Sequence, residues 1–141
     1  MSSFLAEELE EFIKTETDVL GIDPRSQAVI VNVPRGRRAK GIYGFDQSAM
    51  ICRELSRICE IPFCEAIGRK RGGKEQKKLD KSKRLKNVER LFGVINPGDI
   101  DGKYVILFDD IVTTGASMTA CVSLLKKSGA KGIICICVAK D

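Results

Sequence analysis

The sequence contains no histidine, and none of its six cysteines forms a Cys-x-x-Cys pair. Zinc sites are built mainly from these two residue types at short spacings, so the sequence argues against a zinc module. Most of the cysteines stand at positions expected to lie in a core, where a free thiol behaves as a small apolar side chain. Unpaired thiols of this kind favour the reducing cytoplasm as the location.

Long apolar runs and complete nucleotide motifs are also missing. No stretch approaches the ~20 apolar residues that span a bilayer, and the acidic, amphipathic N-terminus is unlike a secretory signal. Neither a GxxxxGK[ST] nor a GxGxxG frame is complete, which disfavours a P-loop or a dinucleotide site. With 141 residues, 43% of them hydrophobic and 30% charged, the chain is predicted to form a single globular domain over residues 1–141.

The central feature of the chain is the stretch KYVILFDDIVTTGAS, residues 103–117. Its apolar run at 105–108 predicts a strand buried in a parallel sheet and ending at Phe108. Two adjacent carboxylates follow, then a hydroxyl- and glycine-rich loop, then a segment with helical apolar spacing. Free backbone N–H groups and a partial positive charge at a helix start suit a phosphate, while carboxylates suit hydroxyls or a cation. The pattern therefore predicts a sugar phosphate site.

The sequence FDDIVTTGAS resembles the signature of type I phosphoribosyltransferases, which bind 5-phosphoribosyl-1-pyrophosphate. The resemblance implies that Asp109 and Asp110 hold the ribose hydroxyls and steer Mg²⁺, and that the following loop holds the 5′-phosphate. The implied loop residues are Val112, Thr113, Thr114, Gly115, Ala116 and Ser117. The haloacid dehalogenase pattern needs Asp-x-Asp, and a receiver domain needs no such loop. A solvated acidic turn that caps a structural helix remains as the alternative.

A second candidate loop follows an apolar strand predicted over residues 28–33. Its sequence, PRGRRAKG at 34–41, places several cations and two glycines where that strand ends, which suits an anion. A solvated basic turn is the alternative. Under the resemblance, the residues that line the pyrophosphate side are Pro34, Arg35, Gly36 and Arg37.

The net charge of +5 is concentrated in one segment. Residues 69–90 contain eleven Lys or Arg against three acidic residues, and they are nearly free of apolar residues. Such a segment cannot bury itself, so we predict a mobile basic loop over about 69–90. The segment has the charge footprint of a nucleic-acid binder but no aromatic residue, so nucleic acid is a less favoured partner.

Other elements are predicted from periodicity and turn residues. Helices are expected over 3–14, from 44–47 up to Pro62, and after residue 117. Strands are expected from Ala66, over 91–95 and over 132–139, with turns at 21–26 and 97–99. The order of elements predicts an α/β domain with a mainly parallel sheet flanked by helices and ligands at the strands' carboxyl ends.

A finer resemblance covers most of the chain, which is similar to the ComF family of phosphoribosyltransferase-like proteins. The matching residues lie within 34–47, 69–92 and 105–117. The chain departs from the family in having Tyr43 where an arginine is usual, Asp46 where an asparagine is usual and Gly73 where a threonine is usual. It also lacks the N-terminal zinc module of many members, in the region where other phosphoribosyltransferases build the hood that recognises the acceptor base.

The resemblance implies a type I phosphoribosyltransferase-like fold and displacement of pyrophosphate from the ribose by an unidentified acceptor, of which a nucleobase is one candidate. Mg²⁺ and nearby cations would stabilise the leaving pyrophosphate. The catalytic residues that the resemblance implies are Asp109, Asp110, Arg71 and Arg84. It also implies a lid that excludes water, formed by Arg71, Gln76 and Arg84.

Two further interpretations of the function stay open. One is a non-catalytic sensor of 5-phosphoribosyl-1-pyrophosphate or a competence-associated adaptor, and another is a nucleic-acid binder that uses the segment 69–90. A homodimer is among the assemblies that we consider, and no membrane contact is expected.

Overall fold

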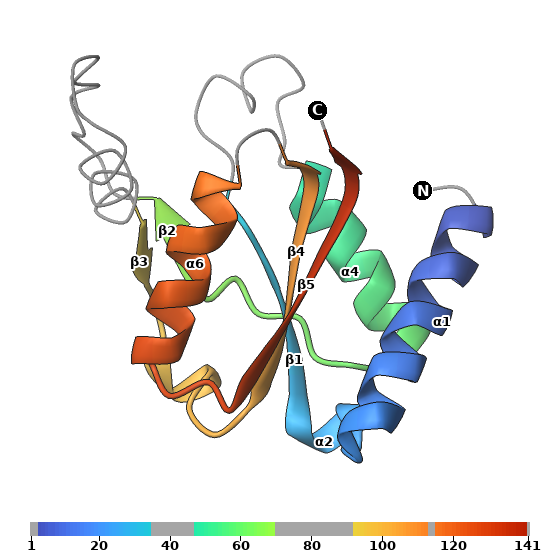
Figure 1. The fold of residues 1–141 in the computed structure, drawn as a ribbon, viewed down its shortest axis with the longest axis horizontal. Helices are drawn as coiled ribbons and strands as arrows, with labels where there is room; N and C mark the ends of the chain where they lie inside the picture. The colour runs from blue at the N-terminus through green and yellow to red at the C-terminus, as the bar shows by residue number, and fades with distance from the viewer. Residues whose placement is uncertain (1–2, 35–46, 70–91, 113–114, 141) are drawn as a thin grey trace.

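The computed structural model describes residues 3–34, 47–69, 92–112 and 115–140. The helical elements are α1 (Ser3–Leu20), α2 (Pro24–Gln27), α4 (Gln47–Cys59), the 3-10 helix η1 (Pro97–Asp99) and α6 (Ala116–Lys127). The strands are β1 (Ala28–Asn32), β2 (Ile67–Arg69), β3 (Phe92–Val94), β4 (Tyr104–Val112) and β5 (Gly132–Lys140). The chain begins with a long helix and a short one, and β1, α4, the hairpin of β2 and β3, η1, β4, α6 and β5 follow in that order (Figure 1).

The main sheet is parallel, with the strand order β1-β4-β5. Asn32 of β1 lies opposite Phe108 of β4, which lies opposite Ile136 of β5. A short parallel bridge at Phe63 extends the sheet beyond β1: the Ile30 N–H donates to the Pro62 carbonyl at 2.8 Å. The Cys64 N–H donates in turn to the Ile30 carbonyl at 2.9 Å. The predicted mainly parallel sheet is confirmed.

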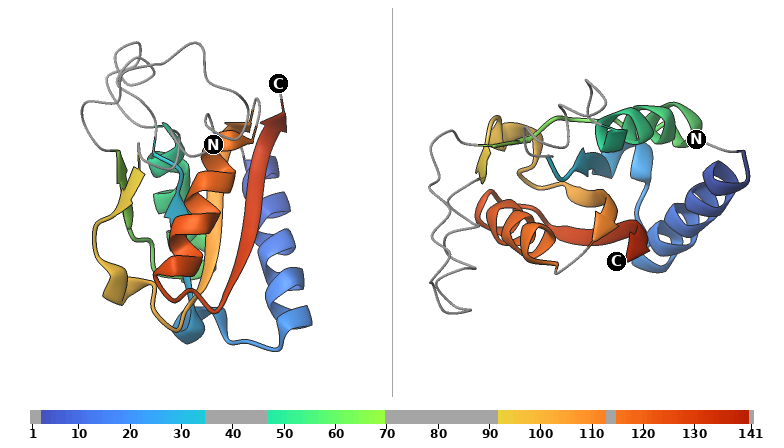
Figure 2. Two further views of the ribbon diagram at one scale, coloured as in Figure 1. Left: turned by 60° about the vertical axis from the view of Figure 1, so that its left-hand side comes forward. Right: turned by 90° about the horizontal axis from the view of Figure 1, so that it is seen from above.

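Helices cover both faces of this sheet. Seen from above in Figure 2, α6 lies on one side of the strands and α1 and α4 lie on the other. All five residues of β1 are buried, as expected of a strand with both faces covered. Alternate residues of each strand therefore point into two different cores.

One core lies between the sheet and α6, and it also takes in the antiparallel hairpin of β2 and β3. Its strand residues include Val105 and Leu107 of β4, and α6 contributes Cys121 and Leu125. The other core lies between the sheet, α1 and α4, and it takes Ile106 and Phe108 from β4. Leu9 and Ile13 of α1 and Cys52 and Leu55 of α4 complete that second core.

Several predicted boundaries were wrong. The strand expected to end at Phe108 continues to Val112, because β4 goes on pairing with β5 through Ile111 and Val112. The first helix extends beyond residue 14 to Leu20, and part of the turn expected at 21–26 is the helix α2. Within the described residues, no helix is long and apolar enough to cross a membrane.

The cysteines were predicted mostly as core residues, and the structure divides them. Cys52 and Cys121 are buried, whereas Cys59 and Cys64 are half-buried. Cys135 and Cys137 are exposed on β5, which comes last among the described strands in the order β1-β4-β5.

Candidate functional site

The candidate site lies at the carboxyl end of the parallel sheet. β1 and β4 end there, and α4 and α6 begin there, at the upper end of the view in Figure 1. The carboxyl edge of an open parallel sheet is where ligands of α/β proteins usually bind. The structure therefore gathers the described candidate residues of β4 and α6 at one edge of the molecule.

The acidic pair belongs to the strand β4 itself. Asp109 and Asp110 each expose only 7% of their surface, which is unusual for carboxylates and marks a specific environment. Because neighbouring residues of a strand point to opposite faces, Asp109 continues the series of Val105 and Leu107 toward α6. Asp110 continues the series of Ile106 and Phe108 toward α1 and α4. The two carboxylates thus begin from opposite faces of one strand.

The surroundings of Asp109 agree with this assignment. Burial raises the pKa of the Cys121 thiol on α6 to about 12, and the negative charge of Asp109 is the second cause of that rise. Asp109 is also the register partner of Cys137 on β5, so the two residues share the α6 face of the sheet. Asp109 therefore lies within electrostatic reach of α6.

A buried polar pair lies on the face to which Asp110 belongs. The side-chain amide of Asn32, at the end of β1, donates to Ser48 Oγ at 3.4 Å. The Ser48 hydroxyl in the first turn of α4 donates to the Val33 carbonyl at 3.3 Å. Ser48 is fully buried and Asn32 is 4% exposed, so this pair links the end of β1 to the start of α4 inside the core.

The sequence analysis did not single out Asn32 or Ser48. A signal for Asn32 was available, because an amide inside an apolar strand is costly to bury unless it is hydrogen-bonded. Ser48 had no comparable signal, since a serine near a helix start is expected for local reasons alone. Both residues lie at the carboxyl edge of the sheet and belong to the candidate site.

The start of α6 has the geometry expected of a close backbone approach. Gly115 takes the N-cap position with φ 78° and ψ 0°, in the left-handed region that glycine tolerates best. Ala116 and Ser117 follow as the first helical residues, and both are partly buried. Gly115 has no side chain, so the N-cap residue itself makes no side-chain hydrogen bond to the start of α6.

Two further predicted site residues lie at the ends of β4 and β1, and the others lie outside the described residues. Val112 is the last residue of β4, and Pro34, half-buried, follows Val33 directly after β1. The predicted residues that lie outside the described ranges are Arg35, Gly36, Arg37, Arg71, Gln76, Arg84, Thr113 and Thr114. The predicted mobile loop at 69–90 lies outside them as well, apart from Arg69 at the end of β2.

The acidic pair has the chemistry that Mg²⁺ prefers, since this ion takes carboxylate oxygens and commonly one or two of them. Among the described residues, no three His, Cys, Asp or Glu side chains are grouped to hold a metal by themselves. A magnesium ion at this edge would therefore draw further ligands from water and from a bound phosphate, as it usually does in phosphate sites.

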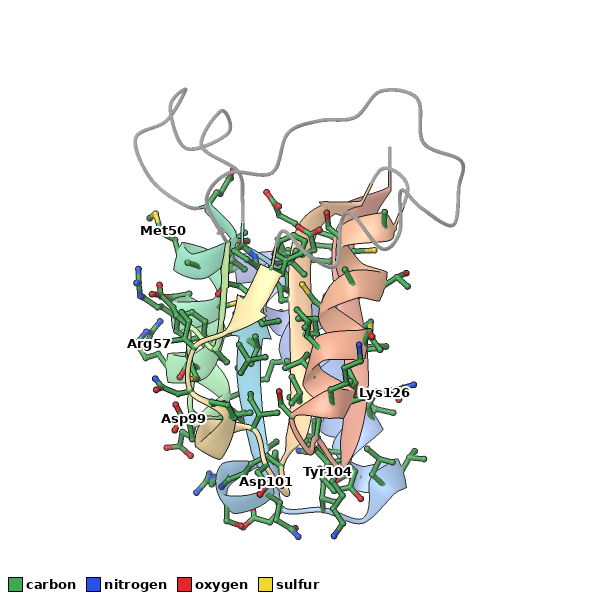
Figure 3. The ribbon with its side chains drawn as sticks, turned by 90° about the vertical axis from the view of Figure 1, so that its left-hand side faces the viewer. Met50, Arg57, Asp99, Asp101, Tyr104 and Lys126 are labelled. Atoms are coloured by element: carbon green, nitrogen blue, oxygen red, sulfur yellow. The ribbon has the colours of Figure 1, made fainter. Side chains whose placement is uncertain are left out.

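A cavity of about 330 Å³ lies at the other end of the sheet, where β1 and β4 begin. Figure 3 shows Asp99, beside this cavity, toward the lower part of the view. Its polar groups already bond within the chain: the Cys64 thiol donates to Asp99 Oδ2 at 3.3 Å, and Lys103 Nζ donates to the Ser26 carbonyl at 3.0 Å. We therefore place the candidate site at the carboxyl edge, where the buried acidic pair lies. The cavity is lined by Ala28, Val29, Pro62, Phe63, Cys64, Gly98, Asp99 and Lys103.

Comparisons with known proteins agree with the fold and with the motif. The family model of the phosphoribosyl transferase domain matches residues 46–141. The DNA utilization protein YhgH of Escherichia coli K12 is 31% identical over 112 residues, which are 79% of this chain and 48% of that protein. The chain thus spans about half the length of the curated relatives that it matches first.

Two solved structures share the fold across nearly all of the chain. The purine phosphoribosyltransferase of Pyrococcus horikoshii aligns with a TM-score of 0.55 at 19% identity, over 99% of this chain and 75% of that one. The adenine phosphoribosyltransferase of Saccharomyces cerevisiae aligns with a TM-score of 0.56 at 19% identity, over 99% of this chain and 70% of that one. From the matched domain, the relative and the shared fold, the chain belongs to the phosphoribosyl transferase domain family, as a ComF-like member with the type I fold.

Proposed function

We propose that this protein binds 5-phosphoribosyl-1-pyrophosphate together with Mg²⁺ at the carboxyl edge of its sheet and transfers the phosphoribosyl group to an acceptor. The observation that carries the proposal is the buried acidic pair near the end of β4, two carboxylates that are each 7% exposed and precede the glycine at the start of α6 in the sequence. The family to which the chain belongs supports the same class of ligand, since the two solved structures with this fold are phosphoribosyltransferases by name.

Each part of the edge has a chemical task in this proposal. The start of α6 offers backbone N–H groups and the positive end of a helix dipole, equivalent to about half an elementary charge, to the 5′-phosphate. Gly115 lets the backbone approach that phosphate, because no Cβ intervenes. Asp109 and Asp110 accept hydrogen bonds from ribose hydroxyls, and charge-assisted bonds of this kind contribute about 1.5–3 kcal/mol each.

The transfer step breaks the bond between C1 of the ribose and the pyrophosphate oxygen and forms a bond from C1 to the acceptor nucleophile. Mg²⁺, when bound, stabilises the charge that develops on the leaving pyrophosphate. The carboxylates of β4 hold the ribose in place while the bond order at C1 changes. In the same proposal, the cations at 35–37 and 71–84 add to the stabilisation of pyrophosphate and exclude water.

The test is calorimetric titration of the protein with 5-phosphoribosyl-1-pyrophosphate, with and without Mg²⁺. We expect Mg²⁺-dependent binding that is lost in the double variant Asp109→Asn/Asp110→Asn and kept in Asp18→Asn, which removes an exposed carboxylate on α1. Pyrophosphate release in the presence of candidate nucleobases then tests the transfer. Equal affinity in the wild type and the double variant would contradict the ribose assignment.

A second candidate is a sensor or adaptor that binds the same ligand without turning it over. The name of the relative YhgH, a DNA utilization protein, favours a task other than the synthesis of nucleotides. Mg²⁺-dependent binding without pyrophosphate release across an acceptor screen would support this candidate. Salt-dependent binding of oligonucleotides would instead support the nucleic-acid interpretation of residues 69–90.

A further inference from the structure

The outer edge of β5 is an open backbone edge of the described sheet. β5 pairs along one side with β4 from Gly132 to Lys140, and none of the described segments pairs with its other side. Figure 2 shows this strand at the end of the sheet, beyond β4. An edge of nine residues at a rise of ~3.3 Å per residue offers roughly 30 Å of hydrogen-bonding backbone.

Eight of the nine residues of this edge carry none of the features that usually block strand pairing, and the one lysine, Lys140, is the last residue of the strand. Residues 132–139, GIICICVA, contain no charge and no proline, in a chain of which 30% is charged. Cys135 and Cys137 are exposed on one face, and Val138 exposes 42% of its surface on the other. Proteins protect long open edges with lysines, prolines or bulges, and an edge without them is a template for another strand.

We propose that two copies of the chain associate through β5, with the two strands antiparallel about a two-fold axis perpendicular to the sheet. An open edge of this type selects an extended, uncharged strand as its partner. The strand β4 lies between β1 and β5, and the outer side of β1 is bridged to the segment at Phe63 through Ile30. Among the described strands of the main sheet, β5 is therefore the one whose outer side can take such a partner. A closed two-fold contact is also the commonest way in which soluble chains assemble.

The sequence of β5 is complementary to itself in this arrangement. A two-fold axis at Ile136 sets Ile134 opposite Val138 of the partner strand, so that apolar side chains meet on the face of α1 and α4. On the α6 face, Cys135 lies opposite Cys137 of the other copy. A net charge of +5 on each copy would oppose association, and an uncharged strand minimises that repulsion at the contact.

The thiols supply a specific marker of the pairing. A two-fold axis at Cys135, Ile136 or Cys137 always sets two thiols of different copies directly opposite each other on the same face. Opposed residues of antiparallel strands have Cα atoms about 4.5–5.5 Å apart, within the range of about 4.4–6.8 Å that a disulfide spans. Mild oxidation with diamide, which takes up the two electrons and two protons of the thiol pair, should therefore link the two copies.

The experiment measures molar mass by light scattering over a hundredfold range of protein concentration, under reducing conditions. The wild type should approach twice 15.5 kDa as the concentration rises. Val138→Lys and Cys137→Lys, both at exposed positions of β5, should stay at the monomer mass. Val19→Lys, which changes a 79%-exposed valine on α1, is the matched control and should behave as the wild type.

Diamide treatment at high concentration should give a disulfide-linked dimer whose peptide map joins Cys135 or Cys137 of the two copies. A wild type that is monomeric throughout would overturn the proposal, as would a dimer that survives both lysine substitutions. A mass that grows beyond two copies would overturn the two-fold arrangement. The result does not depend on whether the protein binds 5-phosphoribosyl-1-pyrophosphate.

Discussion

Replacing Asp109 and Asp110 one at a time with asparagine should separate the two faces of β4. Each change removes one negative charge and keeps the shape of a side chain that is 7% exposed. Because Asp109 belongs to the α6 face, its charge helps to raise the pKa of Cys121 to about 12, second only to burial. Asp109→Asn should therefore lower the pKa of Cys121, which would still stay above its ordinary range because the thiol remains buried. Asp110→Asn should leave the pKa of that thiol as it is.

The two variants should resemble each other in ligand binding. The loss of one charge-assisted hydrogen bond costs about 1.5–3 kcal/mol, so each single variant should bind roughly tenfold to a hundredfold more weakly. Calorimetry with 5-phosphoribosyl-1-pyrophosphate and Mg²⁺ measures this effect. The ionisation of the thiol is followed separately by the chemical shift of the labelled Cβ carbon of Cys121, as the pH is raised from 9 to 12.

The two measurements refute different steps of the reasoning. If Asp110→Asn shifts the titration of Cys121 as much as Asp109→Asn does, the assignment of the carboxylates to opposite faces is wrong. If the thiol responds as expected while neither variant loses affinity, the face assignment stands and the ribose assignment fails. Unchanged circular dichroism of both variants is required before either conclusion is drawn.

Three further predictions concern the edge of the site and the thiols. Gly115→Ala should lower the melting temperature, since φ 78° costs a non-glycine residue about 1–2 kcal/mol, whereas Gly98→Ala, which meets open space, should not. It should also reduce the rise in melting temperature that ribose 5-phosphate causes in the wild type, and an undiminished rise would contradict a phosphate at this loop. Ser48→Ala should lower the urea-derived unfolding free energy by about 1–3 kcal/mol, because a buried hydroxyl that bonds the Val33 carbonyl is removed; no loss would show that this bond contributes nothing. Burial raises the pKa of the Cys121 thiol to about 12, whereas the unfolded thiol has a pKa of about 8.5. The stability that the neutral thiol contributes is therefore fully present below about pH 8.5 and is lost as the pH rises toward about 12. Between pH 8 and 11, the urea-derived unfolding free energy should fall less steeply in Cys121→Ala than in the wild type.

The parallel sheet could be predicted because its strands are continuous apolar runs, and the periodicity of the helices could be read directly. The end of β4 could not, since it depends on a partner strand. Ile111 pairs with Ala139 and Val112 with Lys140, and this pairing carries the strand past the acidic pair. The extension of α1 has a local component as well: the Thr17 hydroxyl donates to the Ile13 carbonyl at 2.9 Å, which satisfies a buried polar side chain inside the helix.

Within the site, the acidic pair and Gly115 could be predicted because their residue types are unusual after a buried strand. The polar pair of Asn32 and Ser48 could not, because its members are sixteen residues apart and meet only when β1 and α4 pack together. The exposure of Cys135 was missed for a related reason. Alternation along a strand shows which residues share a face, but strand order decides whether that face is covered, and the sequence contains no direct signal of order.

The proposed function requires both halves of the acidic pair to contact one ligand, and the position of β4 between β1 and β5 constrains where that ligand would lie. Asp109 leaves the strand on the side of α6 and Asp110 on the side of α4, so a ligand that contacts both must lie across the end of β4 rather than within either core. In a parallel sheet the segments that follow the strands begin at that same edge. The predicted pyrophosphate segment follows β1 at Pro34, and the predicted phosphate loop follows β4 after Val112. Parallel pairing of β1 with β4 therefore brings the starts of these two segments, which lie far apart in the sequence, to the edge that carries the two carboxylates. A phosphorylated sugar with a second charged group needs binding segments that meet at one edge in this way.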